Sequence, residues 1–146
     1  MIDLNKQQED SLNQALEAMY FGFKAMVAKP DAQLKSMGMS RVHHRILYFI
    51  GRHPSCSVRE LLGKLQASKQ YIHKPLKHLV AEGFVQSQAD PNDGRIKRLS
   101  LSEKGMQLEQ VLTGAQRAQF AKVFAEAGVD AEQGWRKVMA ILRQQQ

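Results

Sequence analysis

The segment DPNDGRIKRLSLSEKG, residues 90–105, decides the fold. Its Asp-Pro and Asp-Gly pairs supply the turn chemistry of a β-hairpin tip. Residues of high strand propensity lie on both sides of this tip and predict strands over 84–88 and 96–101. Ser102 then stands where the N-cap of a helix is expected. The sequence therefore predicts a β-hairpin that leads directly into a long helix.

Two short helices are predicted immediately before the hairpin. Residues 57–60 read S-x-x-E, the pattern of a capping box, and start the first of them. Ser68 is the expected N-cap of the second helix and Gly83 its stop signal. Two short helices joined by a tight turn are typical of a helix-turn-helix, although helical hairpins with no role in DNA binding share this pattern.

Longer helices are expected on both sides of this unit. The first is expected to end at Pro30, because proline lacks an amide donor, with a connection over 30–38. A second helix is predicted over 40–53, a long one over 102–128 and a last one from Asp130. The fold class is thus mainly α with a small β-hairpin.

Apolar residues recur at helical spacing along the first and the last helix. Such stripes are too extensive to be buried against so small a central unit, which predicts that they pair with the same helices of a second copy. The methionine and aromatic residues of the first stripe leave a ligand-binding role open as the alternative. The expected dimer-interface residues are Leu12, Leu16, Met19, Phe23, Trp135, Val138 and Leu142.

The positive charge is confined to the middle of the chain. The 146 residues carry a formal net charge of +7, and residues 41–104 hold 12 of the 21 basic but only 5 of the 14 acidic residues. The remaining residues carry equal numbers of each. Lysine and arginine gain affinity for polyanions by displacing counterions from phosphates, so this distribution indicates a nucleic-acid-binding segment. A basic but merely solvated surface is the alternative.

Several classes of protein do not fit the sequence. The apolar runs are interrupted long before the roughly 20 residues of a membrane span, and the first residues do not form a signal peptide. We therefore expect a cytoplasmic protein without membrane contact. We find no motif that joins a nucleophile to a base, and no phosphate-binding loop, so we expect no catalytic residue and no enzymatic activity.

The histidines and the single cysteine do not predict a metal site. His43 and His44 point about 100° apart on a helix, and His73 and His78 are five residues apart rather than the four that would align them. Cys56 has no partner for an internal disulfide and is expected to be a surface thiol. We therefore expect no metal and no cofactor, with a metal- or thiol-responsive sensor as the alternative.

The helix that begins at Ser68 has the residues of a DNA-reading element. Opposite its apolar positions, its outer face has no acidic residue before Glu82. Glutamine pairs with adenine and lysine donates to guanine or to phosphates, whereas an ordinary solvated face is the alternative. Pro75 predicts a kink in this helix, or a regular part that begins only near Lys74. The candidate DNA-binding residues of this helix are Lys69, Gln70, Tyr71, His73, Lys74 and Lys77, with His78 on the same outer face.

The hairpin adds three cations close to its tip. Arg95, Lys97 and Arg98 follow the turn, and an arginine on so short a hairpin can enter a narrow minor groove, where the potential is most negative. We therefore add these three residues to the candidate DNA-binding set. The alternative is that Asp93 and Arg95 only stabilise the turn.

Across essentially its whole length the chain resembles the MarR family of winged helix-turn-helix transcriptional regulators. The resemblance rests on residues 39–47, 57–62, 79–85 and 90–105, of which the last is the most specific, because it is similar to the D-x-R wing of the family and the helix entry after it. Arg95 takes the place of the wing-tip arginine and Asp93 that of the aspartate that supports the wing. Ile96 stands where the family usually has a small residue.

The resemblance implies one domain over 1–146, with a winged helix-turn-helix DNA-binding region over 39–104 and helical dimerisation regions over 1–38 and 105–146. It implies a homodimer that binds a pseudo-palindromic operator in double-stranded DNA, as a repressor relieved by a small-molecule effector. A phenolic or other anionic compound is the implied effector, bound between the dimer helices and the DNA-binding region. A winged-helix module that binds protein is the alternative function.

Overall fold

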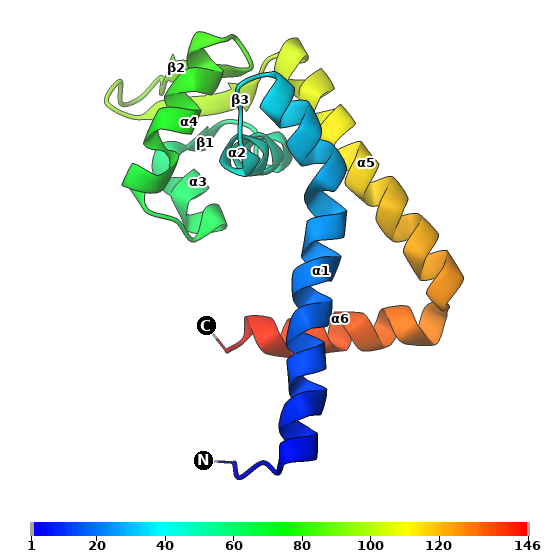
Figure 1. Cartoon of the computed structure of the whole chain (residues 1–146). Coiled ribbons are helices and arrows are strands. Elements are labelled where there is room, and N and C mark those ends of the chain that lie inside the picture. Colours follow the sequence, from blue (N-terminus) through cyan, green and yellow to red (C-terminus); the bar gives the residue numbers. More distant parts are fainter. Residues whose placement is uncertain (1, 146) are drawn as a thin grey trace.

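The computed structural model of the chain describes residues 2–145, so Met1 and Gln146, the outer ends of the two predicted dimerisation regions, lie outside it. The described part folds into six helices and three short strands (Figure 1). In chain order these are α1 Lys6–Ser36, α2 Arg41–Arg52, β1 Cys56–Ser57, α3 Val58–Leu65, α4 Lys69–Ala81, β2 Val85–Ala89, β3 Lys97–Leu101, α5 Glu103–Ala127 and α6 Val129–Arg143.

The elements form a lobe and a limb (Figure 1). The lobe contains α2, α3, α4 and the three strands, and the C-terminal part of α1 and the N-terminal part of α5 pack against it. The rest of α1 and α5, together with α6, extends away from the lobe as the limb. None of the described helices has the length and apolar character that a membrane span requires.

The predicted signals at helix ends are confirmed in the lobe. Ser57 and Glu60 form the capping box of α3, and Ser68 and Ser102 each accept a backbone N–H at the start of α4 and α5. Gly83 follows α4 with a φ of 82°, which glycine adopts without the strain of a side chain. Local hydrogen-bonding chemistry thus fixes where these elements begin and end.

The hairpin forms as predicted and gains a third strand. β3 lies between β2 and β1 in an antiparallel sheet, and Leu99 is opposite Ser87 on one side and Cys56 on the other. Two residues are too short for a periodic pattern, so the sequence analysis did not predict β1. The extra strand attaches the hairpin to the segment that precedes α3.

One apolar core holds the lobe together. Its fully buried side chains come from five helices and the central strand, so they connect elements that are distant in sequence. Burial of each such side chain stabilises the fold by about 1.5–3 kcal/mol before the entropy cost of ordering it. The largest of these side chains are Leu34, Ile46, Leu47, Ile50, Leu61, Ile72, Leu79, Leu99 and Leu112.

The prediction that Pro30 ends the first helix was wrong, because α1 continues to Ser36 and Pro30 is buried inside it. A proline at this position leaves the carbonyl of Met26 without its helical donor. The side chain of Gln116 on α5 takes that role and places its Nε2 atom 3.4 Å from the Met26 oxygen. The neighbouring helix therefore supplies the hydrogen bond that the proline removes.

Pro75 likewise lies inside a continuous helix, so the expectation that the regular part of α4 begins only near Lys74 was wrong. The helix starts at Lys69, where Ser68 Oγ accepts the N–H of Tyr71 at 3.2 Å. Pro75 leaves the Tyr71 carbonyl without its N–H partner four residues later. The first turn of α4 consequently depends more on its cap and on side-chain contacts.

Cys56 is not the surface thiol that the sequence analysis expected. It belongs to β1, is 4 % exposed and packs in the core. Burial raises the pKa of its thiol, and the negative charge of Glu60 adds to this effect. A buried thiol with a raised pKa is a poor nucleophile, which argues against a thiol-responsive sensor at this residue.

Candidate nucleic-acid interface and apolar cavity

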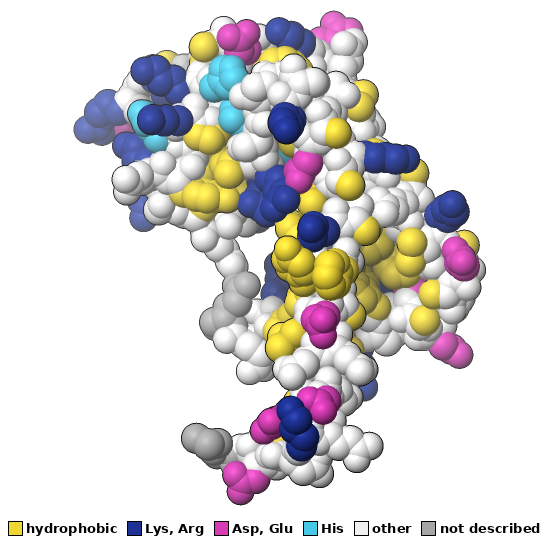
Figure 2. All heavy atoms as spheres, in the orientation of Figure 1, with side chains coloured by type: hydrophobic (Ala, Val, Ile, Leu, Met, Phe, Trp, Pro, Cys, Tyr) yellow, Lys and Arg dark blue, Asp and Glu magenta, His cyan; other side chains and the backbone are white. Residues whose placement is uncertain are grey.

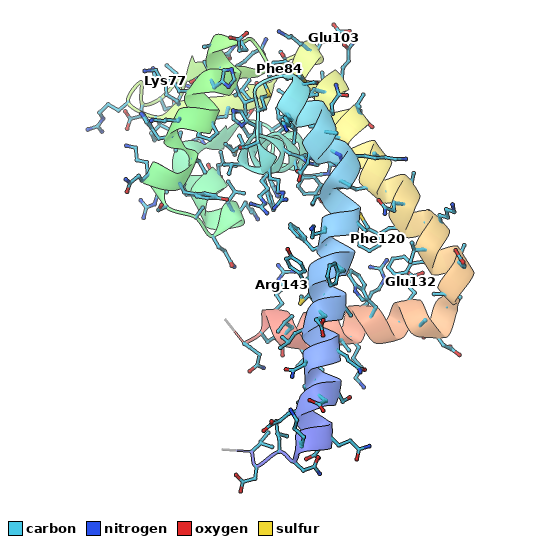
Figure 3. All side chains as sticks on the ribbon, in the orientation of Figure 1. Lys77, Phe84, Glu103, Phe120, Glu132 and Arg143 are labelled. Atoms are coloured by element: carbon cyan, nitrogen blue, oxygen red, sulfur yellow. The ribbon has the colours of Figure 1, made fainter. Side chains whose placement is uncertain are left out.

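The six candidate residues of α4 all lie on the exposed surface of the lobe. Lysines and arginines gather on the part of the lobe that carries α4 and the hairpin (Figure 2), and Lys77 extends from the outer side of α4 (Figure 3). A shallow hollow runs along the N-terminal half of this helix. It is lined by Lys69, Gln70, Tyr71, His73, Lys74 and Pro75.

His78 departs from the expected outer face. It is half-buried, and its Nδ1 atom lies 3.0 Å from Nε2 of His43 on α2.

His73, by contrast, is exposed on α4. Among residues 2–145 there is no group of three histidine, cysteine, aspartate or glutamate side chains that could hold a metal ion.

The hairpin tip presents one exposed arginine in a fixed position. Asp93 Oδ1 accepts the Arg95 N–H at 3.1 Å and its Nε at 3.0 Å, and Oδ2 accepts Nη2 at 3.1 Å. The Arg95 side chain is nevertheless 91 % exposed. These hydrogen bonds lower the pKa of Asp93, so the carboxylate stays ionised beside the arginine. Asp93 thus orients a cation without covering it.

The third cation of the hairpin, Arg98, connects the hairpin to α3. Arg98 donates from Nε to Asp90 at 2.9 Å and from Nη1 to Glu60 on α3 at 2.9 Å. The hydrogen bond from Arg98 is also the main cause of the lowered pKa of Asp90. Two carboxylates on different elements thus hold this guanidinium, whereas Lys97 next to it stays exposed. Arg98 fixes the hairpin, and Arg95 and Lys97 remain available at its surface.

A cavity of about 250 Å³ lies where α1, α2 and α5 meet. Its walls combine aromatic rings with two arginines at the side of α2. It is lined by Phe23, Val27, Pro30, Asp31, Arg41, His44, Arg45, Tyr48, Phe49 and Gln116. Arg41 and Arg45 were not among the predicted site residues, because only the fold brings them next to Phe23 of α1.

The two arginines of the cavity have different partners. Arg41 forms an ion pair with Asp31 at 2.9 Å, and its guanidinium lies 5.2 Å from the centre of the Phe23 ring. Arg45 forms no ion pair with a carboxylate of the described residues, and its Nη1 donates to the Tyr71 hydroxyl at 3.0 Å. At the cavity, Asp31 therefore neutralises the charge of Arg41, whereas no carboxylate of the described residues neutralises that of Arg45.

His44 closes the inner wall of the cavity as a buried imidazole. Its Nε2 atom lies 3.0 Å from the hydroxyl of Thr113 on α5. Burial is the main cause of the lowered pKa of His44, which keeps this ring neutral near pH 7. The positive charge at the cavity therefore comes from the arginines.

The apolar stripes of the limb are open to solvent in the single chain. The predicted interface residues of α1 and α6 are 40–68 % exposed. Trp135 also contacts Phe120 and Phe124 within the chain, with ring centres 5.3 and 5.5 Å apart. Figure 3 shows Phe120 on α5, and Figure 2 shows the apolar side chains along the limb. Such a continuous apolar surface marks an interaction site.

Comparisons with known proteins agree with this architecture. The model of the MarR family matches residues 37–96, which is most of the lobe. The HTH-type transcriptional regulator PetP of Rhodobacter capsulatus is 35 % identical over 131 residues, which cover 90 % of this chain and 79 % of PetP. The HTH-type transcriptional regulator BilQ of Clostridium symbiosum is 30 % identical over 74 residues, about half of each protein.

Solved structures share the fold at lower sequence identity. FabT of Streptococcus pneumoniae, in complex with DNA, has a TM-score of 0.77 at 16 % identity, covering 94 % of this chain and 99 % of FabT. A mutant of MepR of S. aureus, bound to an oligodeoxyribonucleotide, has a TM-score of 0.62 at 18 % identity, covering 92 % of this chain and 98 % of MepR. Together with the match over residues 37–96 and the identity to PetP, the winged helix-turn-helix lobe shows that this chain belongs to the MarR family of transcriptional regulators.

Proposed function

We propose that this regulator binds a pseudo-palindromic operator in double-stranded DNA as a homodimer and represses transcription by occupying it. The observation that carries the proposal is the shared basic surface of α4 and the hairpin, with three exposed lysines on α4 and Arg95 at the tip. Solved relatives of the same fold, FabT and MepR, were determined with DNA. The phosphates of duplex DNA are the negatively charged partner that this basic surface suits.

The residues of this surface suit three kinds of DNA contact. Gln70 and Lys74 lie on the exposed face of α4, where a helix in the major groove presents side chains to base edges. Lys69 and Lys77 suit phosphates, which supply affinity without sequence information. Arg95 suits the minor groove beside the helix. Base contacts then set the sequence specificity, and the phosphate contacts of Lys69 and Lys77 provide affinity.

The homodimer follows from the open stripes of α1 and α6. A single winged helix reads only half of a palindrome, and two copies joined through the limb place two α4 helices about 34 Å apart, one turn of DNA. Leu16 is the most exposed residue of the predicted interface, at 68 %. We expect Leu16→Asp to weaken the dimer in light scattering and to weaken operator binding in parallel.

The cavity between α1, α2 and α5 is the proposed effector site. It lies between the limb and the DNA-binding lobe, so a bound molecule contacts both parts. Its aromatic rings and its uncompensated Arg45 favour a small aromatic anion over a neutral or cationic compound. Charge-assisted hydrogen bonds to a guanidinium are about twice as strong as neutral ones, which supports this selectivity. The proposal includes no metal and no other cofactor.

Selection of bound sites from a random pool of duplex DNA tests the proposed function. We expect a palindrome whose half-sites are about one helical turn apart, and an affinity that falls steeply with salt. Failure to bind any duplex at low salt would overturn the proposal and favour the alternative that the basic surface binds an acidic protein. A recovered site without symmetry would overturn the homodimeric reading alone.

A further inference from the structure

Arg45 belongs to two surfaces at once. It is one of the residues that line the cavity, and its Nη1 atom donates a 3.0 Å hydrogen bond to the hydroxyl of Tyr71 on α4. Tyr71 in turn lines the hollow on the DNA-facing side of α4 together with Gln70. One guanidinium therefore joins the proposed effector cavity to the first turn of the proposed DNA-reading helix.

The partner of Arg45 in this structure is a phenolic hydroxyl. A carboxylate is the stronger acceptor for a guanidinium, because the bond is charge-assisted and can engage two N–H groups. Arg41 already has Asp31 at 2.9 Å, so it gains less from an added anion than Arg45 does. An aromatic carboxylate in the cavity would consequently compete with Tyr71 for the Arg45 guanidinium.

The first turn of α4 is the part of the helix that most needs this contact. Pro75 removes the N–H that would bind the Tyr71 carbonyl, so the backbone gives Tyr71 one hydrogen bond fewer than its neighbours have. The Ser68 cap and the Arg45 hydrogen bond are the side-chain interactions that hold Tyr71. Loss of the Arg45 bond frees both the ring and the helix turn that carries Gln70.

We infer that Arg45 is the residue through which occupancy of the cavity reaches the recognition helix. Without a ligand it positions Tyr71 for DNA, and an aromatic carboxylate takes its guanidinium and releases Tyr71. The inference rests on the proposed function, since it assumes an operator and an anionic effector. Arg45 acts here as a positioning residue for α4 and as a binding residue for the carboxylate.

A double-mutant cycle on the free protein tests the DNA half of the inference. Tyr71→Phe removes the hydroxyl and keeps the ring, and Arg45→Gln removes the cation. We expect each variant to bind the selected operator about 3- to 10-fold more weakly, the effect of one lost hydrogen bond, and the double variant to be no weaker than either single one. Arg117→Gln is the matched control, because it removes an exposed guanidinium on α5 that donates to Gln110 and lines neither the cavity nor α4, and we expect its operator affinity to equal that of the wild type. Effects that multiply in the double variant would overturn the inference, because the two residues would then act independently.

Benzoate and its neutral analogue benzamide test the ligand half. Because Tyr71 competes with the ligand for Arg45, Tyr71→Phe should bind benzoate several-fold more tightly than the wild type in calorimetry, and Arg45→Gln more weakly. Benzoate should release the wild type from the operator, but it should leave the residual operator affinity of Tyr71→Phe unchanged, and benzamide should release neither.

The possible failures are distinguishable. Equal benzoate affinity for the wild type and Tyr71→Phe would overturn the competition for Arg45 and leave the effector cavity intact. No benzoate binding to the wild type at millimolar concentration would overturn the anionic effector site, and with it the ligand half of the inference. An absence of duplex binding by the wild type would overturn the proposed function itself.

Discussion

The imidazoles of His43 and His78 join the start of α2 to the recognition helix, with Nε2 of His43 3.0 Å from Nδ1 of His78. The backbone N–H of Ser40 donates to Nδ1 of His43 at 3.0 Å, so neutral His43 carries its proton on Nε2 and donates it to His78. Protonation of His43 on Nδ1 would place two donors against each other at Ser40. The hydrogen bond from the Ser40 N–H therefore favours a neutral His43.

This contact predicts a loss of stability in mild acid. The pKa of His43 lies below its ordinary value of 6.5, first because of burial and then because of His78, and burial also lowers the pKa of His44. The unfolded chain then binds protons more tightly than the folded one, so the free energy of unfolding falls as the pH drops below about 6.5. The lowered carboxylate pKa values, such as that of Asp90, act only at more acidic pH.

Urea unfolding between pH 7.5 and 5.5 measures this effect. His43→Gln keeps an acceptor and a donor but does not titrate, so its stability should depend less on pH than that of the wild type. His73→Gln, on the exposed face of α4, should keep the full pH dependence. A wild-type stability that is constant across this range would contradict the prediction.

The bond between Gln116 and the Met26 carbonyl predicts a specific coupling with Pro30. Gln116→Leu leaves that carbonyl unpaired and should lower the free energy of unfolding by about 1–2 kcal/mol. Pro30→Ala returns the missing backbone N–H, so Gln116→Leu should cost clearly less in that background. Chemical denaturation of the two single variants and the double variant measures the coupling. Additive costs would show that Gln116 acts independently of the proline.

Gly105 predicts a steric limit where the wing joins α5. A Cβ atom at this residue would collide with the backbone carbonyl of Phe84, the residue before β2. Gly105→Ala should therefore destabilise the protein by about 1–3 kcal/mol or more. Gly63→Ala is the matched control, because its Cβ meets no atom within 4 Å and alanine favours a helix, so it should raise stability by up to about 1 kcal/mol. Thermal melts of the two variants should shift in opposite directions.

The wing predicts different outcomes for its two arginines. Arg95→Ala should weaken operator binding about tenfold and leave the melting temperature unchanged, because the side chain is 91 % exposed. Arg98→Ala should weaken operator binding and also lower the melting temperature, because it removes the cation that pairs with both Asp90 and Glu60. Arg98→Lys should not restore both properties, since one ammonium cannot reproduce the planar fork that reaches two carboxylates. Unchanged DNA affinity in Arg95→Ala would remove the wing from the interface.

The features that depend on local chemistry were predictable from the sequence. The capping box at Ser57, the N-cap at Ser102 and the turn at Asp93 and Gly94 act through hydrogen bonds within a few residues, so their patterns are visible in the chain. The placement of most elements follows from such signals. The exposed candidate face of α4 was predictable for the same reason, since helical periodicity fixes which residues share a face.

The features that the analysis missed depend on contacts between distant segments. Pro30 continues a helix because Gln116 is beside it, and Cys56 is buried because β1 pairs with β3. His78 turns inward because His43 on α2 offers it a hydrogen bond, and Arg45 gains its position from Tyr71, 26 residues later in the chain. Tertiary packing determines these contacts, and no pattern of neighbouring residues in the sequence predicts them.

The burial of α1 has a mechanical consequence. Its buried residues, Val27, Pro30 and Leu34, all lie in the last third of the helix, and the first two line the cavity, whereas the preceding turns project from the lobe as one continuous helix. From Pro30 to Lys6 this rod is about 36 Å long, so a tilt of about 5° at the clamped end displaces the far end by about 3 Å. A molecule that fills the cavity of about 250 Å³ would contact α1 at its buried end, where a small tilt moves the far end of the helix most. In the proposed dimer, a small shift of α1 near Pro30 would change the distance between the two α4 helices.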